Sequence, residues 1–204
     1  MPDRSIDRLT LYGERRSGNC MKTVWVARHV GLDFDFVEMD LVAGATRTHA
    51  YRAVNPFAKV PMARWPNGNV LTESNAIMLY LCELAADRSL LPAAAFDHAR
   101  MMAWLFWEQY SHEPHIAGRR FQKVWLGKDD DELDPQQYER GLAALNRMED
   151  HLDRQSWFAG DQLSLADVAL VAYTRWAPEG GFDLGPYPQI SAWISRVESA
   201  IDLS

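Results

Sequence analysis

Two short segments hold the residues whose types and spacing could do chemistry. The first is the pair Glu73-Ser74, which comes just before a helix-forming apolar run at 76–81. A serine at a helix start presents free backbone N–H groups and the positive end of the helix dipole, which favour a carboxylate. Glu73 beside it can bind an ammonium group. The pair predicts a site for the head group of an amino acid, and the alternative is that Ser74 only caps its helix.

The second segment is Val60-Pro61, which follows Lys59. A proline has no N–H for a sheet ladder, so in a strand pattern it marks a strand start, an edge or a cis turn. We predict a cis bond before Pro61, with the N–H and C=O of Val60 turned toward an extended, peptide-like ligand. The alternative is an ordinary trans turn.

The elements around these segments must hold them in place. The run 59–62 predicts a strand start, and 64–69 contains the Asn67-Gly68 pair that is typical of a tight reversal. Apolar strand character resumes at 70–71, and 72–75 is a polar helix cap. Upstream, alternation at 9–12 and 34–39 predicts strands, with a helix at 21–30 and a weak helical signal at 41–51. The order β-α-β-α-β-β-α indicates an α/β domain.

With these residues the sequence resembles the glutathione transferase family, in particular its bacterial-type cytosolic members of the serine type. The thioredoxin-like half of that family carries a cis-proline after a valine and a Glu-Ser pair at the following helix. The resemblance covers nearly the whole chain. It implies glutathione as co-substrate, with no metal, at a binding site that comprises Lys59, Val60, Pro61, Glu73 and Ser74. In this assignment Val60 pairs with the cysteinyl backbone, and Glu73 and Ser74 hold the γ-glutamyl end.

The loop at 14–20 is the predicted seat of catalysis, because it joins the end of the first strand to a helix start. Ser17 and Asn19 can each donate a hydrogen bond to a thiolate there. In the family that the chain resembles, a serine, tyrosine or cysteine of this loop activates the glutathione thiol, so the resemblance implies that Ser17 is catalytic with Asn19 as its helper. Cys20 is the competitor, either as a reactive thiol at a helix start or as a small core residue.

The composition indicates a globular protein of 204 residues, 48% of them hydrophobic and 24% charged. A net charge of -7 argues against binding to nucleic acid or to anionic membranes. The N-terminal segment 1–13 has no apolar core of signal-peptide length, and no apolar stretch approaches a membrane span. The two cysteines have no disulfide or metal-ligand spacing, which is typical of a cytoplasmic protein.

Beyond a break at 87–97 the chain is predicted to be helical. The segment 98–109 is apolar around its circumference, which suggests an interface and, with the family's habit, a homodimer. The segment 110–115 should interrupt this helix, because Pro114 lacks an intrahelical donor and should kink or bend the helix there. Three nearby residues lack the HExxH spacing of a metal site and are assigned to a pocket wall: His112, Glu113 and His115. By family analogy, a hydrophobic electrophile would lie against Trp107, Tyr110 and Phe121.

Further helices are predicted at 135–154 and 188–200, and Ser164 and Asp167 have the spacing of a capping box before the apolar run 168–173. Asp167 is therefore expected to be structural. The predicted organisation is a thioredoxin-like domain at 1–86, a linker at 87–97 and an all-helical domain at 98–204.

The predicted function is that of a glutathione transferase, which stabilises the glutathione thiolate for attack on an electrophilic small molecule. Two alternatives stay open from the residues alone. One is a glutathione-dependent peroxidase or disulfide reductase that uses Cys20, and the other is a non-catalytic binding protein with the transferase fold.

Overall fold

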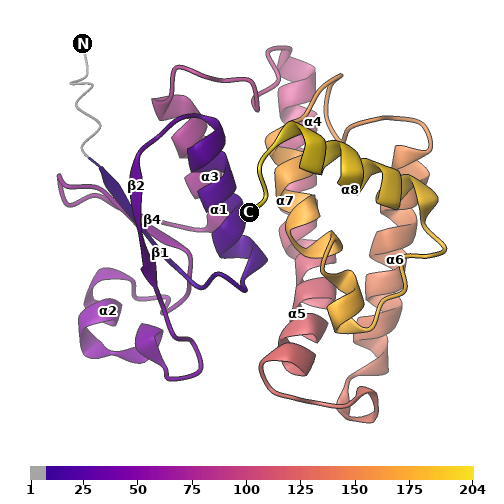
Figure 1. The fold of residues 1–204 in the computed structure, drawn as a ribbon, viewed down its shortest axis with the longest axis horizontal. Coiled ribbons are helices and arrows are strands. Elements are labelled where there is room, and N and C mark those ends of the chain that lie inside the picture. Colours follow the sequence, from indigo (N-terminus) through magenta and orange to yellow (C-terminus); the bar gives the residue numbers. More distant parts are fainter. Residues whose placement is uncertain (1–7) are drawn as a thin grey trace. The chain divides into compact units, whose positions relative to one another are not determined.

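The computed structural model describes residues 8–204. Residues 1–7 lie outside the described residues. They are part of the segment 1–13, for which the sequence predicted no signal peptide. The chain divides into two compact units (Figure 1). The first comprises residues 1–88 with 202–204, and the second comprises residues 89–201.

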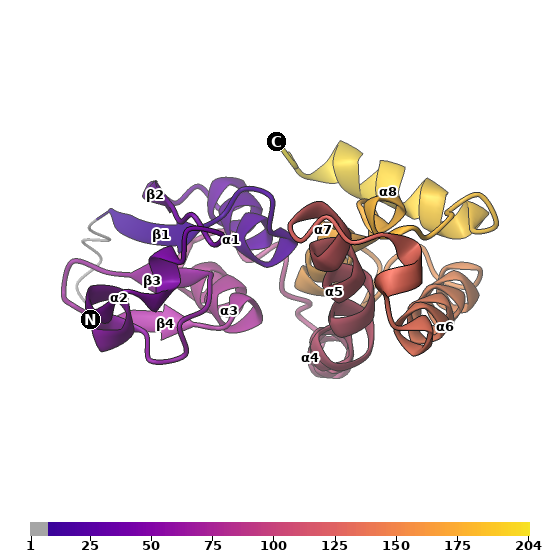
Figure 2. The ribbon, with the colours of Figure 1, turned by 90° about the horizontal axis from the view of Figure 1, so that it is seen from below.

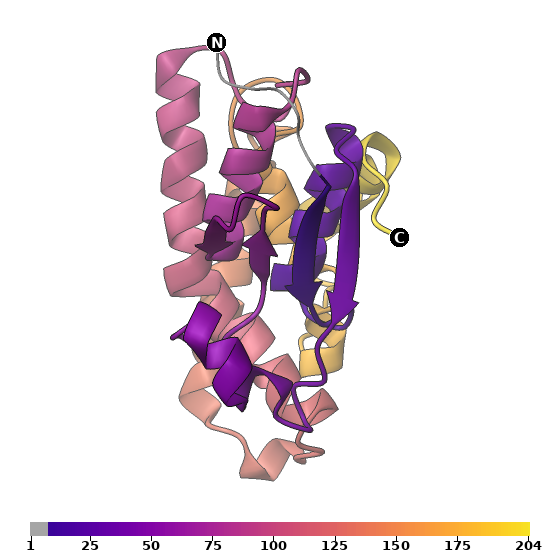
Figure 3. The same ribbon diagram turned by 90° about the vertical axis from the view of Figure 1, so that its left-hand side faces the viewer.

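The first unit is built on a four-stranded sheet of order β2-β1-β3-β4 (Figure 3). Strands β1 and β2 are parallel, whereas β3 is antiparallel to both β1 and β4. The elements follow one another as β1 (Leu9–Gly13), α1 (Gly18–His29), β2 (Phe34–Glu38), a 3₁₀ turn (Ala45–Arg47), α2 (His49–Val54), β3 (Met62–Arg64), β4 (Val70–Thr72) and α3 (Ser74–Leu84). This is the predicted order, and it confirms the α/β prediction.

The hairpin differs from the sequence prediction at one end. Strand β3 begins at Met62 rather than at Lys59, and it continues to Arg64, where a turn was expected. The reason is pairing with β1, because Arg64 stands opposite Thr10 and keeps its backbone in the ladder. The reversal itself is formed by 65–69, where the Gly68 N–H donates to the Trp65 carbonyl at 2.9 Å.

The second unit contains helices only, which confirms the all-helical prediction for this half (Figure 2). They are α4 (Ala95–Trp107), a π-helical turn (Glu108–His112), α5 (Glu113–Val124), α6 (Pro135–Leu152), α7 (Leu165–Thr174) and α8 (Pro188–Ala200), with 3₁₀ turns at Asp130–Glu132 and Ala177–Gly180. Pro114 does not break the helical path. It lies in the first turn of α5, where a missing N–H leaves no bond unmade, and the π turn accommodates the change.

Helix α7 is the core of this unit, since all of its residues are buried. The predicted capping box is confirmed: the Ser164 side chain accepts from the backbone of Asp167, and the Asp167 carboxylate accepts from the Ser164 N–H at 3.0 Å. The same carboxylate accepts bonds from the Phe158 N–H at 3.1 Å and from the Trp193 indole at 3.0 Å. Burial raises its pKa to about 6, and these bonds oppose the rise. Through its bond with Trp193, Asp167 connects α7 to α8.

Helix α4 buries Met101 and Leu105 in this unit, but much of its surface is exposed. Four small or aromatic residues with spacings of three and four define one exposed apolar stripe: Phe96, Ala99, Ala103 and Phe106. Phe96 is 76% exposed and Phe106 is 69% exposed.

Candidate functional site

The start of α3 places Glu73 and Ser74 in distinct roles. Glu73 occupies the cap position with φ 69° and ψ 112°, and its side chain makes no capping hydrogen bond. Ser74 is the first residue inside the helix, so it is not the cap. Its buried hydroxyl instead donates to the amide oxygen of Asn19 at 3.1 Å. This bond joins the N-terminus of α3 to that of α1.

Ser17 lies at the N-cap of α1, where its side chain makes no capping bond and is partly exposed. Its carbonyl accepts from the N–H groups of Cys20 and Met21 at 3.1 and 2.9 Å. The Ser17 side chain also forms a hydrogen bond with the Cys20 thiol. The hydroxyl is therefore held at the helix start by local contacts, at the place where the sequence predicted a thiolate.

Cys20 is fully buried, and burial raises the pKa of its thiol to about 11, although hydrogen bonds from the Ser17 side chain and from the Glu14 backbone oppose the rise. A thiol with that pKa is protonated at neutral pH and is a poor nucleophile. Gly13 explains how Cys20 packs so closely against the end of β1. A Cβ at Gly13 would lie 2.8 Å from the Cys20 Cβ and 3.2 Å from the Phe36 ring, so only glycine lets β1 end against α1.

The two arginines before Ser17 are both paired with carboxylates. Arg16 donates from Nε and Nη2 to the two carboxylate oxygens of Glu14, at 2.6 and 3.0 Å. Arg15 donates from its backbone N–H to Glu38 at 3.0 Å, and its Nε lies 3.3 Å from the same carboxylate. Their positive charges are largely neutralised where they lie, so the field at Ser17 comes mainly from the helix terminus.

The peptide bond between Val60 and Pro61 is cis, which confirms the prediction. Neither backbone polar group of Val60 is hydrogen-bonded to another residue within 8–204. The loop before it is held through the Lys59 carbonyl, which accepts from the Tyr51 hydroxyl at 2.7 Å and from the Asn55 amide at 2.8 Å. The Lys59 side chain itself is exposed. This arrangement leaves the Val60 backbone available for an extended ligand.

Sequence reasoning missed the residues that support this loop. Asn55 is fully buried, and its side chain also accepts from the Phe57 N–H at 3.1 Å, so it organises the turn. In the sequence Asn55 stands directly before Pro56. An asparagine before a proline does favour turns, and that signal could have identified it. No comparable local signal marks Tyr51, because its hydroxyl acts eight residues further along the chain.

The residues predicted to face an electrophile belong to the second unit. Trp107 and Tyr110 line one cavity of about 730 Å³, and Tyr110 is 84% exposed. Phe121 does not line it. That ring lies further along α5, stacked on Trp125 with a centroid distance of 5.5 Å.

Of the three residues that were assigned to a pocket wall, only His115 lines this cavity. The His112 ring is buried, 2.9 Å from the Thr174 hydroxyl. Within residues 8–204, no three His, Cys, Asp or Glu side chains are arranged to hold a metal ion.

Together, the first unit offers two helix N-termini with no acidic residue in the first turn, a serine hydroxyl at each of them, and the backbone of Val60 with no hydrogen bond to the described residues. Such a site suits a peptide-like ligand that carries anionic groups at two points.

Comparisons with known proteins identify the family of the chain. Residues 7–83 match the family model of the glutathione S-transferase N-terminal domain, and residues 98–200 match that of the C-terminal domain. Glutathione S-transferase 3 of Zea mays is 34% identical over 198 residues, which cover 93% of this chain and 88% of that protein.

Along the part of the chain that is described, no helix combines the length and apolar character needed to cross a bilayer.

Solved structures of glutathione S-transferases are also similar to this chain. A glutathione S-transferase from Pseudomonas fluorescens is 40% identical with a TM-score of 0.88, and the match covers 94% of each chain. A second, from Xanthobacter autotrophicus, is also 40% identical with a TM-score of 0.86, over 94% of this chain and 93% of that one.

Proposed function

Because the chain belongs to the glutathione S-transferase family, we propose that it binds glutathione in the first unit and stabilises the thiolate for attack on an electrophilic small molecule. The observation that carries this proposal is the hydrogen bond between Ser74 and Asn19. It brings together the two helix starts that would receive the two ends of the ligand, the γ-glutamyl group at α3 and the sulfur at α1.

Binding of the peptide portion rests on the backbone of Val60 and on the start of α3. The backbone of Val60 would exchange hydrogen bonds with the cysteinyl residue of glutathione, as in strand addition. The N-terminus of α3 with Ser74 would receive the γ-glutamyl carboxylate, and the exposed carboxylate of Glu73 would receive its ammonium group. The positive φ of Glu73 supports a binding role, because strained backbone is retained mainly at functional sites.

Thiolate stabilisation would come from Ser17, with Asn19 as a second donor. A free thiol has a pKa of about 8.5, and lowering it by one unit requires about 1.4 kcal/mol of preferential stabilisation of the anion. A hydrogen bond to a charged group contributes roughly 1.5–3 kcal/mol, so the Ser17 hydroxyl is sufficient, and the N-terminus of α1 adds to it. The burial of Cys20 favours this scheme over one in which that cysteine is the nucleophile.

For the electrophile we propose Trp107 and Tyr110 as apolar contacts, supported by the cavity that they share. Phe121 has weaker support, because it lies outside that cavity and stacks on Trp125. The chemical identity of the electrophile follows from none of these contacts.

A homodimer is part of the proposal. The exposed apolar stripe on α4 carries two phenylalanines that are more than two thirds exposed, and a second copy of the chain would cover them. We also propose the predicted domains, 1–86 and 98–204 joined by 87–97, and a cytoplasmic location, which the two free buried cysteines support.

The test is calorimetric titration with glutathione, followed by conjugation of glutathione to an activated aryl chloride. We expect saturable binding and turnover, and loss of most turnover but little affinity in Ser17→Ala. Absence of glutathione binding would contradict the proposal. Full turnover in Ser17→Ala together with its loss in Cys20→Ala would instead support the reductase scheme.

A further inference from the structure

The peptide unit between Lys59 and Val60 carries two polar groups with different surroundings. Its carbonyl, that of Lys59, accepts one hydrogen bond from the Tyr51 hydroxyl at 2.7 Å and another from the Asn55 side-chain amide at 2.8 Å. Its N–H, that of Val60, has no hydrogen bond to a residue of 8–204. One half of the unit is therefore fixed by the protein, and the other half is available to a ligand.

The geometry of a peptide unit links the directions of these two groups. A peptide unit is planar, and in its trans form the C=O and N–H bonds point in opposite directions. The Lys59–Val60 bond is trans, since the only cis bond within residues 8–204 is the one that follows it. The Lys59 carbonyl points toward Tyr51 and Asn55, so the Val60 N–H points away from them. Whatever fixes the carbonyl also aims the N–H.

The two donors are themselves held in place. Tyr51 is 8% exposed and Asn55 is fully buried. The Asn55 amide nitrogen also donates to the Tyr51 hydroxyl at 3.4 Å, so each donor orients the other. The Tyr51 ring packs in a small core with Met39 and Met62. Two donors that are fixed in this way leave the shared carbonyl little freedom to rotate.

Asn55 also shapes the loop that connects α2 to β3 (Figure 3). Its side-chain oxygen accepts from the Phe57 N–H at 3.1 Å, and its carbonyl accepts from the Ala58 N–H at 3.0 Å. Its own N–H donates to the Tyr51 carbonyl at 2.8 Å. Ala58 has φ 54°, in the left-handed region that a residue with a Cβ seldom adopts. Every polar group of Asn55 thus serves the turn that leads into Lys59.

This network favours binding in two ways. The direction of the Val60 N–H is set before a ligand arrives, so binding does not have to order the peptide unit. Hydrogen bonds in a chain also polarise one another. Bonds to the Lys59 carbonyl therefore make the Val60 N–H a stronger donor to a ligand.

We propose that Asn55 and Tyr51 are positioning residues of the glutathione site, which act through the Lys59–Val60 peptide and aim the Val60 N–H at the cysteinyl carbonyl of the ligand. The inference rests on the proposed function, because it names the residues that prepare one of its contacts. In this scheme neither side chain touches the ligand, and neither affects the ionisation of the sulfur.

Calorimetric titration with S-hexylglutathione measures the effect on affinity. Tyr51→Phe removes one donor and keeps the packed ring, and we expect it to weaken binding about threefold. Asn55→Ala removes the other donor together with the turn, and we expect a loss of about tenfold. In turnover assays KM for glutathione should rise by similar factors. The kcat at saturating glutathione and the pKa of the bound thiol should stay unchanged.

The matched control is Thr48→Ala. The Thr48 hydroxyl caps α2 by accepting from the Tyr51 N–H at 3.3 Å, and it makes no bond to Lys59. Loss of this cap should lower the free energy of unfolding and leave the affinity for S-hexylglutathione as in the wild type. If Thr48→Ala weakens binding as much as Tyr51→Phe does, the loop responds to any loss of stability and the proposal is wrong.

A second ligand tests whether the effect passes through Val60. It is an S-hexylglutathione analogue with a trans-alkene in place of the cysteinyl–glycyl amide, so it has no cysteinyl carbonyl to accept from the Val60 N–H. The wild type should bind it less tightly than S-hexylglutathione, and Tyr51→Phe should cause no further loss. Equal losses for both ligands in Tyr51→Phe would contradict the positioning role.

Two remaining outcomes separate this inference from the proposed function. Wild-type affinity for S-hexylglutathione in both Tyr51→Phe and Asn55→Ala would reject the positioning role and leave the glutathione site intact. A wild-type protein that binds neither glutathione nor S-hexylglutathione would overturn the proposed function, and this inference with it.

Discussion

The Ser74 hydroxyl donates to the amide oxygen of Asn19 at 3.1 Å, across 55 positions of sequence. Because the Asn19 oxygen accepts this bond, the amide N–H groups of Asn19 point away from Ser74. Ser74 can therefore act at two places, at the γ-glutamyl carboxylate through α3 and at the sulfur through the orientation of Asn19.

Ser74→Ala tests this coupling. We expect the pKa of the bound thiol to rise by a few tenths of a unit as Asn19 loses its partner, and glutathione affinity to fall several-fold, since the start of α3 loses its hydroxyl and its bond to α1. Asn19→Ala should produce the rise in pKa with less loss of affinity. In the double variant the two pKa effects should not add, because the residues act as a unit. Additive effects would show that the bond has no part in thiolate stabilisation.

Ser17→Ala should raise the pKa of bound glutathione by about one unit, which corresponds to about 1.4 kcal/mol. Affinity should stay nearly unchanged, because the hydroxyl favours only the ionised sulfur. The measurement is thiolate absorbance against pH in the glutathione complex. Cys20→Ala is the matched control and should leave the titration in place, because the Cys20 thiol is buried and protonated. A shift in the control alone would refute the serine assignment.

Glu73→Gly should separate stability from binding. Glycine adopts a positive φ without a Cβ penalty, so we expect the free energy of unfolding to rise by about 1 kcal/mol in denaturant titrations. Glutathione affinity should fall, since the carboxylate that receives the ammonium group is gone. Glu73→Gln keeps the backbone strain and removes only the charge, so it should lose affinity at unchanged stability. Unchanged affinity in both variants would leave Glu73 without a role in binding.

Phe106→Glu should dissociate the proposed homodimer, because it places a charge at one end of the exposed apolar stripe, on one of its two large side chains. Light scattering should show a fall from the mass of two chains to that of one. Leu126→Glu is the control, since Leu126 is also more than half exposed but lies outside the stripe. A wild-type protein with the mass of one chain at all concentrations would contradict the dimer.

His151 predicts a pH dependence of stability. Burial lowers the pKa of its imidazole, the nearby arginines lower it further, and the bond to the Trp157 carbonyl opposes this. The unfolded chain, with a pKa of about 6.5, then binds a proton before the folded chain does. The stability that neutral His151 contributes is fully present above about pH 6.5. It is lost as the pH falls through the lower pKa of the folded state.

Denaturant titrations at about pH 7.5 and about pH 5.5 should show this loss in the wild type and a smaller one in His151→Gln. The comparison between the two proteins removes the contribution of all other groups that titrate in this range. An equal loss in both proteins would mean that His151 titrates alike in the folded and unfolded states.

Features that depend on neighbours in the chain were determined by the sequence alone. The capping box of Ser164 and Asp167, the bounds of α8, the Asn67-Gly68 reversal and the order of strands and helices follow from hydrogen bonds and periodicities within a few residues. The predicted bounds of a strand were less accurate where pairing with another strand sets them. Arg64, for example, belongs to β3 because it pairs with β1.

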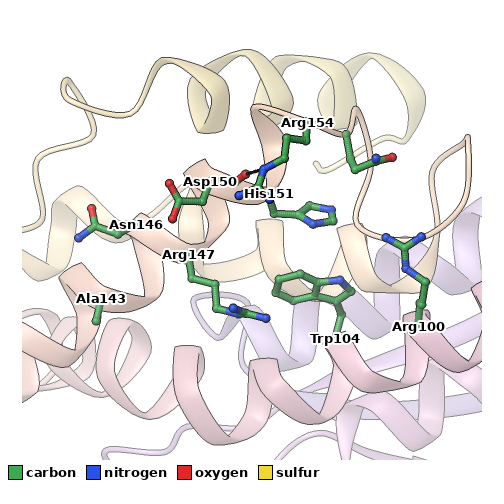
Figure 4. Close-up of a pocket in the computed structure, with 9 residues that line it drawn as sticks. Arg100, Trp104, Ala143, Asn146, Arg147, Asp150, His151 and Arg154 are labelled. Atoms are coloured by element: carbon green, nitrogen blue, oxygen red, sulfur yellow. Dashed lines mark hydrogen bonds between the residues drawn. The ribbon is translucent and has the colours of Figure 1, made fainter.

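Tertiary structure alone decided which side chains meet. Sequence identified both Ser74 and Asn19 as site residues, but only the packing of α3 beside α1 joins them. The burial of Cys20 follows from the missing side chain at Gly13, and the support of Lys59 by Tyr51 follows from the fold of its loop. Arg100 and Arg147, which line one groove (Figure 4), lie on α4 and α6, far apart in the chain. Periodicity shows which face of a helix is polar, but the free energy of burial and charge is set by contacts across the fold, which no local pattern records.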